Sequence, residues 1–238
     1  MRTGSGPIKS AMRRGFPPCR WRLGAAGLSL ALVCGCEALT PAVALHPRSF
    51  SLADARWAAQ VSPRTGITAA ATAPTLIVSP PHAAAGFDSP HIVYVRQASQ
   101  LERYAHNDWV DTPARMLAPL IVAAIERGRA IRAVVQTPST VAGDMRLDTE
   151  VLRLQHEFLG KPSRVRFTLR AYLVDNVTRR VLASREFEAV AAAPSEDPYG
   201  GVMAANEAVR SVLERLAAFC AETAARSWTR SAAEAVPR

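Results

Sequence analysis

The stretch RVRFTLRAYL, residues 164–173, decides the fold of this chain. Apolar and polar side chains alternate along it without a break, which is the pattern of a β-strand whose successive side chains point to opposite faces. One face of this strand is therefore expected to lie in a core, and the other is expected to face water. The inward set is Val165, Phe167, Leu169, Ala171 and Leu173, and the outward set is Arg164, Arg166, Thr168, Arg170 and Tyr172.

The residues that follow predict a hairpin, with a turn over 175–180 and a returning strand over 181–187. One register satisfies both faces of this hairpin, because it joins apolar residues inside and opposite charges outside. Arg185 is the exception, since it falls on the inward parity. The predicted pairs are Leu173 with Val181, Phe167 with Phe187, and Arg166 with Glu188.

A long extended segment, Met145 to Phe158, precedes the hairpin. Its apolar residues keep one parity as far as Val151 and the other parity from Leu152 onward. A β-bulge near these two residues is predicted to return both sets to the same side of the sheet.

Shorter β-rich runs bounded by Pro and Gly predict further strands. They lie at 75–79 and 92–96, with an extended piece at 101–109, a short strand at Val134-Val135 and an edge strand near Phe50 and Leu52.

Two helices are predicted. The first starts at Pro113, where Asp111 or Thr112 can accept hydrogen bonds from the first-turn amides, and ends at Gly128 in a left-handed conformation. The second carries an apolar stripe at spacings of three and four residues, ending at Cys220. The fold class is therefore α/β, a single sandwich domain in which a mixed β-sheet packs against two principal helices. The stripe consists of Val202, Asn206, Val209, Leu213, Leu216 and Cys220.

The N-terminus has the layout of a bacterial lipoprotein signal peptide. A basic segment is followed by an apolar run from Leu23 and then by Val33-Cys34-Gly35-Cys36. Cys36 is the predicted lipidation site, because Gly35 supplies the small residue that cleavage requires. The apolar run is shorter than the roughly 20 residues of a membrane-spanning helix. The predicted organisation is a signal peptide over 1–35, a tether over 36–48, a domain over 49–226 and a disordered tail over 227–238.

The charge belongs largely to this leader. The chain has 29 basic and 20 acidic residues, for a net charge of +9, but six basic residues and no acidic residue precede Cys36. The remainder has 29 − 6 = 23 basic against 20 acidic residues, or +3, so nucleic acid is not expected as a partner. Only Cys220 remains after Cys36, which excludes an internal disulfide there and favours a core role for Cys220.

One cluster could carry chemistry. His106, Asp108 and Asp111 could bind a metal, or act as acid and base. The alternative, which we favour, is that Asp111 caps the helix and that His106 is packed or solvated. No Gly-x-Ser-x-Gly elbow and no phosphate-binding loop occurs in the sequence. We therefore predict no catalytic residues, no metal and no cofactor.

Two features suggest partner contacts. Arginines cluster on the predicted hairpin, where Arg166 and Arg170 are candidate partner-binding residues; a solvated face balanced by Glu186 and Glu188 is the favoured alternative. Tyr199 lies in an acidic loop over 195–201, which either caps the last helix or contacts a partner.

The order of these elements resembles the ABC-type transport auxiliary lipoproteins, the group that includes the PqiC-like proteins. The resemblance runs from about Phe50 to Ala225 and rests mainly on the order of elements and on the Asn107-x-Trp109 feature before the first helix. It implies an α/β sandwich, lipid-anchored in the periplasm and without catalytic residues.

The resemblance also implies partners. Such proteins are accessory subunits of MCE-type transporters, which move phospholipids or other hydrophobic molecules between the two envelope membranes. The expected partners are a periplasmic MCE protein with its ABC permease and ATPase, the membrane through the lipid anchor, and further copies of the chain itself. Glu37 after the acylated cysteine implies sorting to the outer membrane. Two alternatives are a structural or assembly lipoprotein of the envelope and a small hydrolase that uses His106 and Asp108.

Overall fold

The computed structural model describes residues 47–52 and 73–234, with side chains as far as residue 227. Strand β7 (Met145–Glu157) is the centre of the sheet. Along one edge it pairs antiparallel with β8 (Arg164–Asp175), which pairs antiparallel with β9 (Val181–Ala192). The strand predicted from the alternating stretch is thus the middle member of a long antiparallel ribbon, and all five of its predicted inward residues are buried.

Three short strands share the other edge of β7, one after another. They are β2 (Thr75–Val78), β3 (His82–Ala83) and β4 (His91–Val95), and all run parallel to β7. A strand of 13 residues is long enough to pair with all three in succession. Strand β3, which directly follows Pro80-Pro81, was not predicted.

The sheet widens beyond these strands. β6 (Ala133–Gln136) pairs parallel with β2, β5 (Glu102–Trp109) pairs antiparallel with β4, and β1 (Arg48–Phe50) pairs parallel with β5. The result is a nine-stranded mixed sheet. The predicted α/β class with a mixed sheet and two helices is confirmed.

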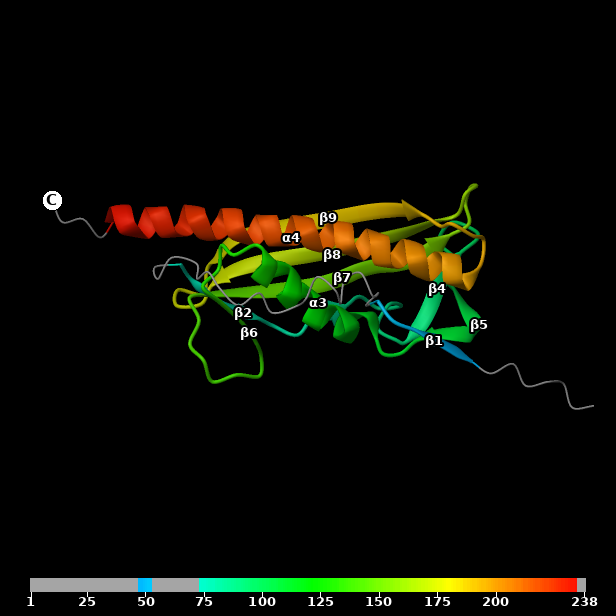
Figure 1. The fold of residues 1–238 in the computed structure, drawn as a ribbon, viewed down its shortest axis with the longest axis horizontal. Helices are drawn as coiled ribbons and strands as arrows, with labels where there is room; N and C mark the ends of the chain where they lie inside the picture. The colour runs from blue at the N-terminus through cyan, green and yellow to red at the C-terminus, as the bar shows by residue number, and fades with distance from the viewer. Residues whose placement is uncertain (1–46, 53–72, 235–238) are drawn as a thin grey trace, which may run out of the picture. The chain divides into compact units, whose positions relative to one another are not determined.

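Two helices, α3 (Pro113–Arg127) and α4 (Pro198–Glu234), cover one face of this sheet, as Figure 1 shows. Helix α4 runs along β8 and β9, and α3 packs beside it. Their buried side chains meet the inward residues of the strands, and this burial is the main favourable term in folding. Within the described residues, no helix combines the length and apolar character that crossing a membrane requires.

The sequence placed the β8–β9 hairpin in the wrong register. Leu173 lies opposite Ala183, Phe167 opposite Ala189, and Thr168 opposite Glu188, so the true pairing differs by two residues. A register irregularity between Leu173 and Val174 accompanies this shift. Since a shift of two residues keeps every side chain on its own face, the hydrophobic pattern fits both registers equally well.

Arg185 is explained by its position at the edge of the sheet. It lies opposite Ala171 on the inward parity but is exposed, and its guanidinium carbon lies 4.9 Å from the ring centroid of Phe219. The cation therefore stacks on an aromatic ring at the margin of the core. An inward-pointing charge on an edge strand also discourages unwanted strand pairing.

The ends of α3 differ from their predictions. Thr112 is the N-cap but makes no side-chain capping bond, and Asp111 Oδ1 accepts from the Thr112 amide rather than from the first turn. Gly128 is right-handed, with φ −69°, and its amide bonds back to the Ile125 carbonyl. The left-handed residue is Arg129, with φ 52°.

The bulge predicted near Val151–Leu152 is present, between Val151 and Arg153.

The boundaries of two other predicted segments move. Helix α4 continues to Glu234, which corrects the disordered tail predicted from residue 227; residues 225–234 are largely Ala, Arg and Ser, without Gly or Pro to end a helix. β1 begins at Arg48, inside the predicted tether, while the signal peptide and Cys36 lie outside the described residues.

Candidate functional site

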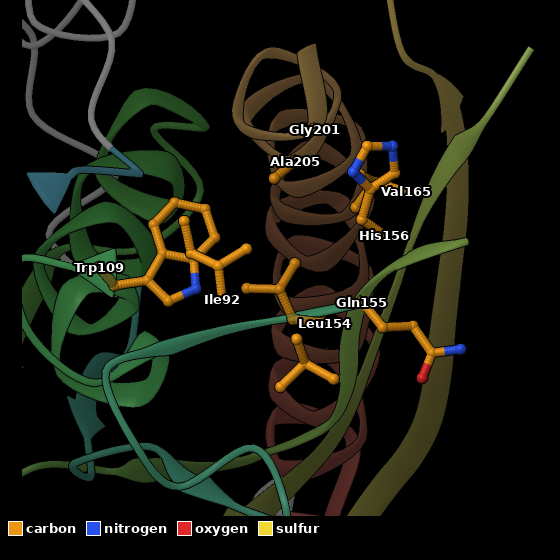
Figure 2. Close-up of a pocket in the computed structure, with 9 residues that line it drawn as sticks. Ile92, Trp109, Leu154, Gln155, His156, Val165, Gly201 and Ala205 are labelled. Carbon is orange, nitrogen blue, oxygen red and sulfur yellow. The ribbon is translucent and has the colours of Figure 1, made fainter. Parts of the chain in front are cut away.

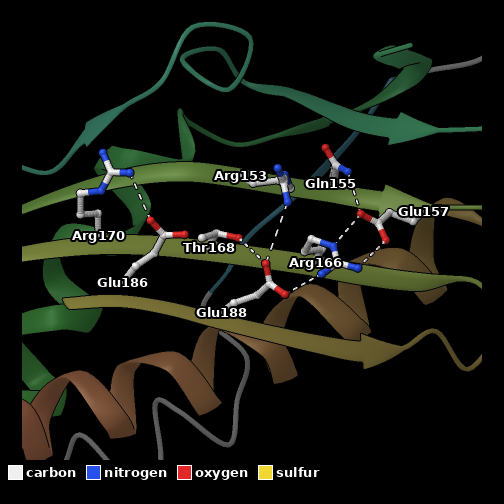
Figure 3. A network of polar contacts seen from close by, with 8 residues as sticks. All are labelled: Arg153, Gln155, Glu157, Arg166, Thr168, Arg170, Glu186 and Glu188. Atoms are coloured by element: carbon white, nitrogen blue, oxygen red, sulfur yellow. Dashed lines mark hydrogen bonds and ion pairs between the residues drawn. The ribbon is translucent and has the colours of Figure 1, made fainter. Parts of the chain in front are cut away.

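The outward face of β7, β8 and β9 carries a network of ion pairs, shown in Figure 3. Arg166 is its centre: its Nε lies 2.9 Å from Glu157 Oε1 on β7, and its Nη1 lies 2.6 Å from Glu188 Oε1 on β9. Thr168 Oγ1 donates to Glu188 at 3.3 Å, and Arg153 lies 3.9 Å from the same carboxylate. The two-residue register shift makes the Arg166–Glu188 pair diagonal across the strands instead of directly opposite.

A second group surrounds Arg170. Its guanidinium lies 3.1 Å from Glu186 on β9 and 3.5 Å from Glu150 on β7. The predicted arginine cluster is therefore interleaved with carboxylates from both neighbouring strands. This geometry agrees with the balanced face that the sequence favoured over an unpaired basic patch.

The surroundings of Glu157 in this network favour the ionised form of its carboxyl group. Burial opposes ionisation of its carboxyl group, but hydrogen bonds from Arg166 and Gln155 outweigh that effect, and the pKa of Glu157 is lowered. Its side chain is 12% exposed, against 29% for Arg166. The Glu157–Arg166 pair is thus partly shielded from water and holds the guanidinium in one position.

A buried polar cluster forms behind this face, at the start of α4. His156 on β7 has its Nε2 2.8 Å from Ser163 Oγ and its Nδ1 3.1 Å from the Tyr104 hydroxyl. Figure 2 shows the imidazole beside Gly201 on α4. The amide of Ser163 donates to Glu196 at 2.8 Å, so the cluster joins β5, β7 and the α4 entrance. Both ring nitrogens have partners, which a buried histidine requires.

Burial controls the ionisation of this cluster. It lowers the pKa of His156, although the nearby carboxylates of Glu196 and Asp197 act in the opposite direction. Burial also raises the pKa of Tyr104, with smaller contributions from Tyr94 and the same two carboxylates. At neutral pH the imidazole and the phenol are therefore both neutral hydrogen-bonding groups.

The Ser163–His156 pair has the distance of a nucleophile and its base, but its surroundings do not suit catalysis. Ser163 is fully buried and His156 is 2% exposed. The adjoining cavity, lined by Ile92, Trp109, Leu154 and Ala205 among others, has a volume of about 10 Å³. That is room for about one water molecule and not for a substrate.

The residues predicted as a metal or acid–base cluster are not brought together. Asp108 lies 2.9 Å from His91, Asp111 bonds the Thr112 amide, and His106 is exposed. Among the described residues, no group of three or more His, Cys, Asp or Glu side chains is arranged to hold a metal ion. The packed or solvated interpretation of His106 agrees with its exposure.

Tyr199 lies in the first turn of α4, on the helix side of the sheet and away from the arginine network. Asp197 precedes it as the helix cap, since its Oδ1 accepts from the Gly200 amide at 2.7 Å and from Ser195 Oγ at 3.0 Å. The Tyr199 side chain is 59% exposed, and its ring lies 6.5 Å from that of Phe50. The acidic loop therefore caps the helix, and Arg166, Arg170 and Tyr199 do not form one surface.

Comparison with known proteins defines the class of this protein, which is an auxiliary lipoprotein of ABC-type transport. The chain belongs to the family described as the ABC-type transport auxiliary lipoprotein component, whose model matches residues 52–217, well over half of the chain. The resemblance inferred from the sequence is confirmed. A lipoprotein of this family is associated with the cell envelope.

Solved structures share the fold. Protein XCC0632 from Xanthomonas campestris is 25% identical, with a TM-score of 0.60 over 68% of this chain and 94% of its own. An uncharacterized protein of known structure is 12% identical, with a TM-score of 0.56 over 74% of this chain and 99% of its own. No curated protein matches this sequence.

Proposed function

We propose that this protein is a lipid-anchored periplasmic subunit of an MCE-type ABC transport system that moves phospholipids or other hydrophobic molecules between the envelope membranes. The observation that carries the proposal is the family match over residues 52–217. In this proposal the chain acts by binding a periplasmic MCE protein and its permease and ATPase, and it catalyses no reaction itself.

The anchor in this proposal is Cys36, with Glu37 directing the protein to the outer membrane. Several acyl chains on one cysteine hold a protein far more firmly than a single chain does. Labelling with radioactive palmitate tests this. Label is expected in the wild type and in Cys34→Ala and lost in Cys36→Ala, and retention of label in Cys36→Ala would overturn the assignment.

The outward face of β7–β9 is the partner surface in this proposal. Within residues 47–52 and 73–234, the helices lie on the other face, and Arg166 and Arg170 are held by carboxylates in fixed positions. Tyr172 and Val190, 37% and 42% exposed, add apolar area between the charges. A surface with a preorganised arginine beside apolar side chains suits a protein partner, because little side-chain freedom is lost on binding.

Co-purification from detergent tests the partner and its surface together. The wild type is expected to bring down MCE, permease and ATPase subunits, and Arg170→Glu is expected to lose them. Arg103→Glu is the matched control, since Arg103 is an exposed arginine on β5 outside this network. Light scattering of the purified protein reports whether copies of the chain also assemble with one another.

The alternative is a structural or assembly lipoprotein with no transport role. It would be favoured if the anchored protein carried no transporter subunit in that experiment. Loss of lipid transport between the membranes in the deletion strain, restored by wild type but not by Arg170→Glu, would instead favour the transport role.

A further inference from the structure

Strand β9 forms one edge of the sheet. Within residues 47–52 and 73–234 it pairs with β8 alone, so no described strand lies along the opposite side of its backbone. A free edge presents a row of backbone amides and carbonyls, and proteins normally protect such a row against pairing with other chains. Two protective features are present on β9, and both lie in the same part of the strand.

The protected part of the edge is residues 185–188. Arg185 places a charge on the inward parity, and the Glu188 carbonyl accepts a hydrogen bond from Arg215 on α4 at 2.6 Å. The residues that follow, Ala189 to Ala193, are small, apolar and uncharged. Because neither kind of protection extends to residues 189–193, this part of the edge has the character of a strand that pairs with another chain.

The register of β8 and β9 shows which backbone groups of this part point outward. The Ala193 amide donates to the Ser163 carbonyl at 2.8 Å, so odd-numbered residues of β9 are the ones that bond to β8. Residues with and without such bonds alternate along an antiparallel ladder. The amides and carbonyls of Glu188, Val190 and Ala192 therefore point away from β8. The contact from α4 to the Glu188 carbonyl agrees with this assignment.

We propose that residues 189–193 pair antiparallel with the same residues of a second copy of the chain, about a two-fold axis at Ala191. In this register Val190 lies opposite Ala192 of the second copy, and their outward amides and carbonyls satisfy one another. Ala191 lies opposite Ala191 of the second copy as a pair without hydrogen bonds, where the backbones approach most closely and a small side chain fits. A two-fold contact of this kind joins one surface to itself.

The position of the axis follows from Glu188. With the axis at Ala191, Glu188 lies opposite Pro194 of the second copy, which has no N–H to donate. The Glu188 carbonyl already accepts from Arg215, so this register requires no further bond from it. An axis one residue earlier would instead direct the amide of Ala192 at that occupied carbonyl.

The paired segment is short, so pairing depends on the local concentration of the chain. Five residues from each copy cannot bury the roughly 1,600 Å² that is typical of a stable protein–protein interface. Copies anchored through Cys36 share one membrane surface, which raises their local concentration as a linker does for two joined modules. The inference therefore rests on the proposed lipid anchor, and pairing is expected on vesicles but not in dilute detergent.

Disulfide cross-linking of the full, lipidated chain in vesicles of phosphatidylethanolamine and phosphatidylglycerol tests the pairing. Two cysteines on the axis can be bridged, since the Cα atoms of such a pair lie about 4.5 Å apart. Oxidation with copper phenanthroline is expected to link Ala191→Cys several-fold more than Ser184→Cys, an exposed position of β9 outside the paired segment. Val190→Cys has no cysteine directly opposite it in this register and is expected to link less than Ala191→Cys.

Proline variants test the same pairing through the backbone. Ala192→Pro removes an amide that points away from β8, so the hydrogen bonds within the sheet remain while one bond to the second copy is lost. Ser184→Pro is the matched control, because it removes an outward amide outside the paired segment. In the Ala191→Cys background, Ala192→Pro is expected to lower the yield of linked dimer several-fold, and Ser184→Pro is expected to leave it unchanged.

The possible failures are distinguishable. A protein that does not float with the vesicles contradicts the lipid anchor and, with it, this inference. A protein that floats but links no more through Ala191→Cys than through Ser184→Cys overturns only the pairing, and preferred linking through Val190→Cys overturns the register. Absence of a link in vesicles, with residues 189–193 protected from deuterium exchange only when transporter subunits are bound, also overturns the pairing and assigns the edge to a strand of those subunits.

Discussion

Gly201 lies directly against the imidazole of His156: a Cβ added to Gly201 would come within 2.5 Å of Nδ1 and 3.0 Å of Cε1. The ring cannot move aside freely, because Tyr104 and Ser163 hold its two nitrogens. The first turn of α4 and the C-terminal half of β7 are thus fitted to each other at one point. The absence of a side chain at residue 201 allows this approach.

Gly201→Ala is therefore expected to destabilise the protein. The added methyl group forces the helix or the histidine out of position, which typically costs about 1–3 kcal/mol, although alanine itself favours a helix over glycine by about 1 kcal/mol. Gly160→Ala is the control, since nothing lies within 4 Å of a Cβ at that position. Chemical denaturation measures both free energies of unfolding, and equal stability of the two variants would contradict the close fit.

His156 is expected to make stability depend on pH. Burial lowers its pKa in the folded state, so the unfolded chain binds a proton more readily. The stabilisation is present above the unfolded pKa of about 6.5 and is lost as pH falls below it, by at most about 1.4 kcal/mol per pH unit for one proton.

His156→Gln is expected to remove this pH dependence while lowering stability at pH 8. His106→Gln, which removes an exposed histidine, is the control and is expected to keep the wild-type slope. Denaturation curves from pH 8 to pH 5 give the slopes. A wild-type slope that persists in His156→Gln would assign the effect to another group.

The Glu157–Arg166 pair is expected to contribute more than the Glu186–Arg170 pair. Glu157 is 12% exposed and shares its carboxylate between Arg166 and Gln155, whereas Glu186 is 51% exposed. Glu157→Ala is expected to cost about 1–3 kcal/mol because Arg166 loses a charged hydrogen-bond partner, and Glu186→Ala less than about 1 kcal/mol. Chemical denaturation at low and high salt measures the loss of unfolding free energy in each variant. Equal losses in the two variants would contradict this ranking.

Cys220 is expected to be unreactive in the folded protein. The thiol is fully buried on α4, and burial raises its pKa to about 12. Only the thiolate reacts rapidly with alkylating reagents. Mass spectrometry of the Cys220 peptide after alkylation at pH 8 should find it unmodified in native protein and modified in guanidinium. Rapid native labelling would mean that α4 opens at this point.

The sequence predicted element types well and their pairing less well. The alternation from Val165 to Leu173 identified the buried apolar face of β8, although Thr168 of the outward set is buried as well, and the stripe ending at Cys220 identified the inner face of α4. The register of β8 and β9 was wrong by two residues, because both registers bury the same side chains. What separates them is the irregularity at Leu173–Val174 and the turn, where Asp175 accepts from the amides of Val177 and Thr178.

The candidate surfaces were predicted only in part. Arg166 and Arg170 were placed on the outward face of the hairpin and Tyr199 in the loop before the last helix, but the sequence did not show that these two features lie on different sides of the sheet. The buried His156 cluster was missed, although His156 already lay on the inward parity after the bulge. A polar residue on an apolar face could have signalled such a cluster.

The sequence by itself determined which side of each strand and helix is apolar, because this depends on local periodicity alone. It also contained the order of elements that the family shares. Only the tertiary structure decided which distant groups meet: Tyr104 and His156, 52 residues apart, and Asn206 with Ser51, 155 residues apart. Such contacts depend on how the strands are ordered around β7. That order depends on the free energy of the whole packed core, and no short stretch of sequence contains it.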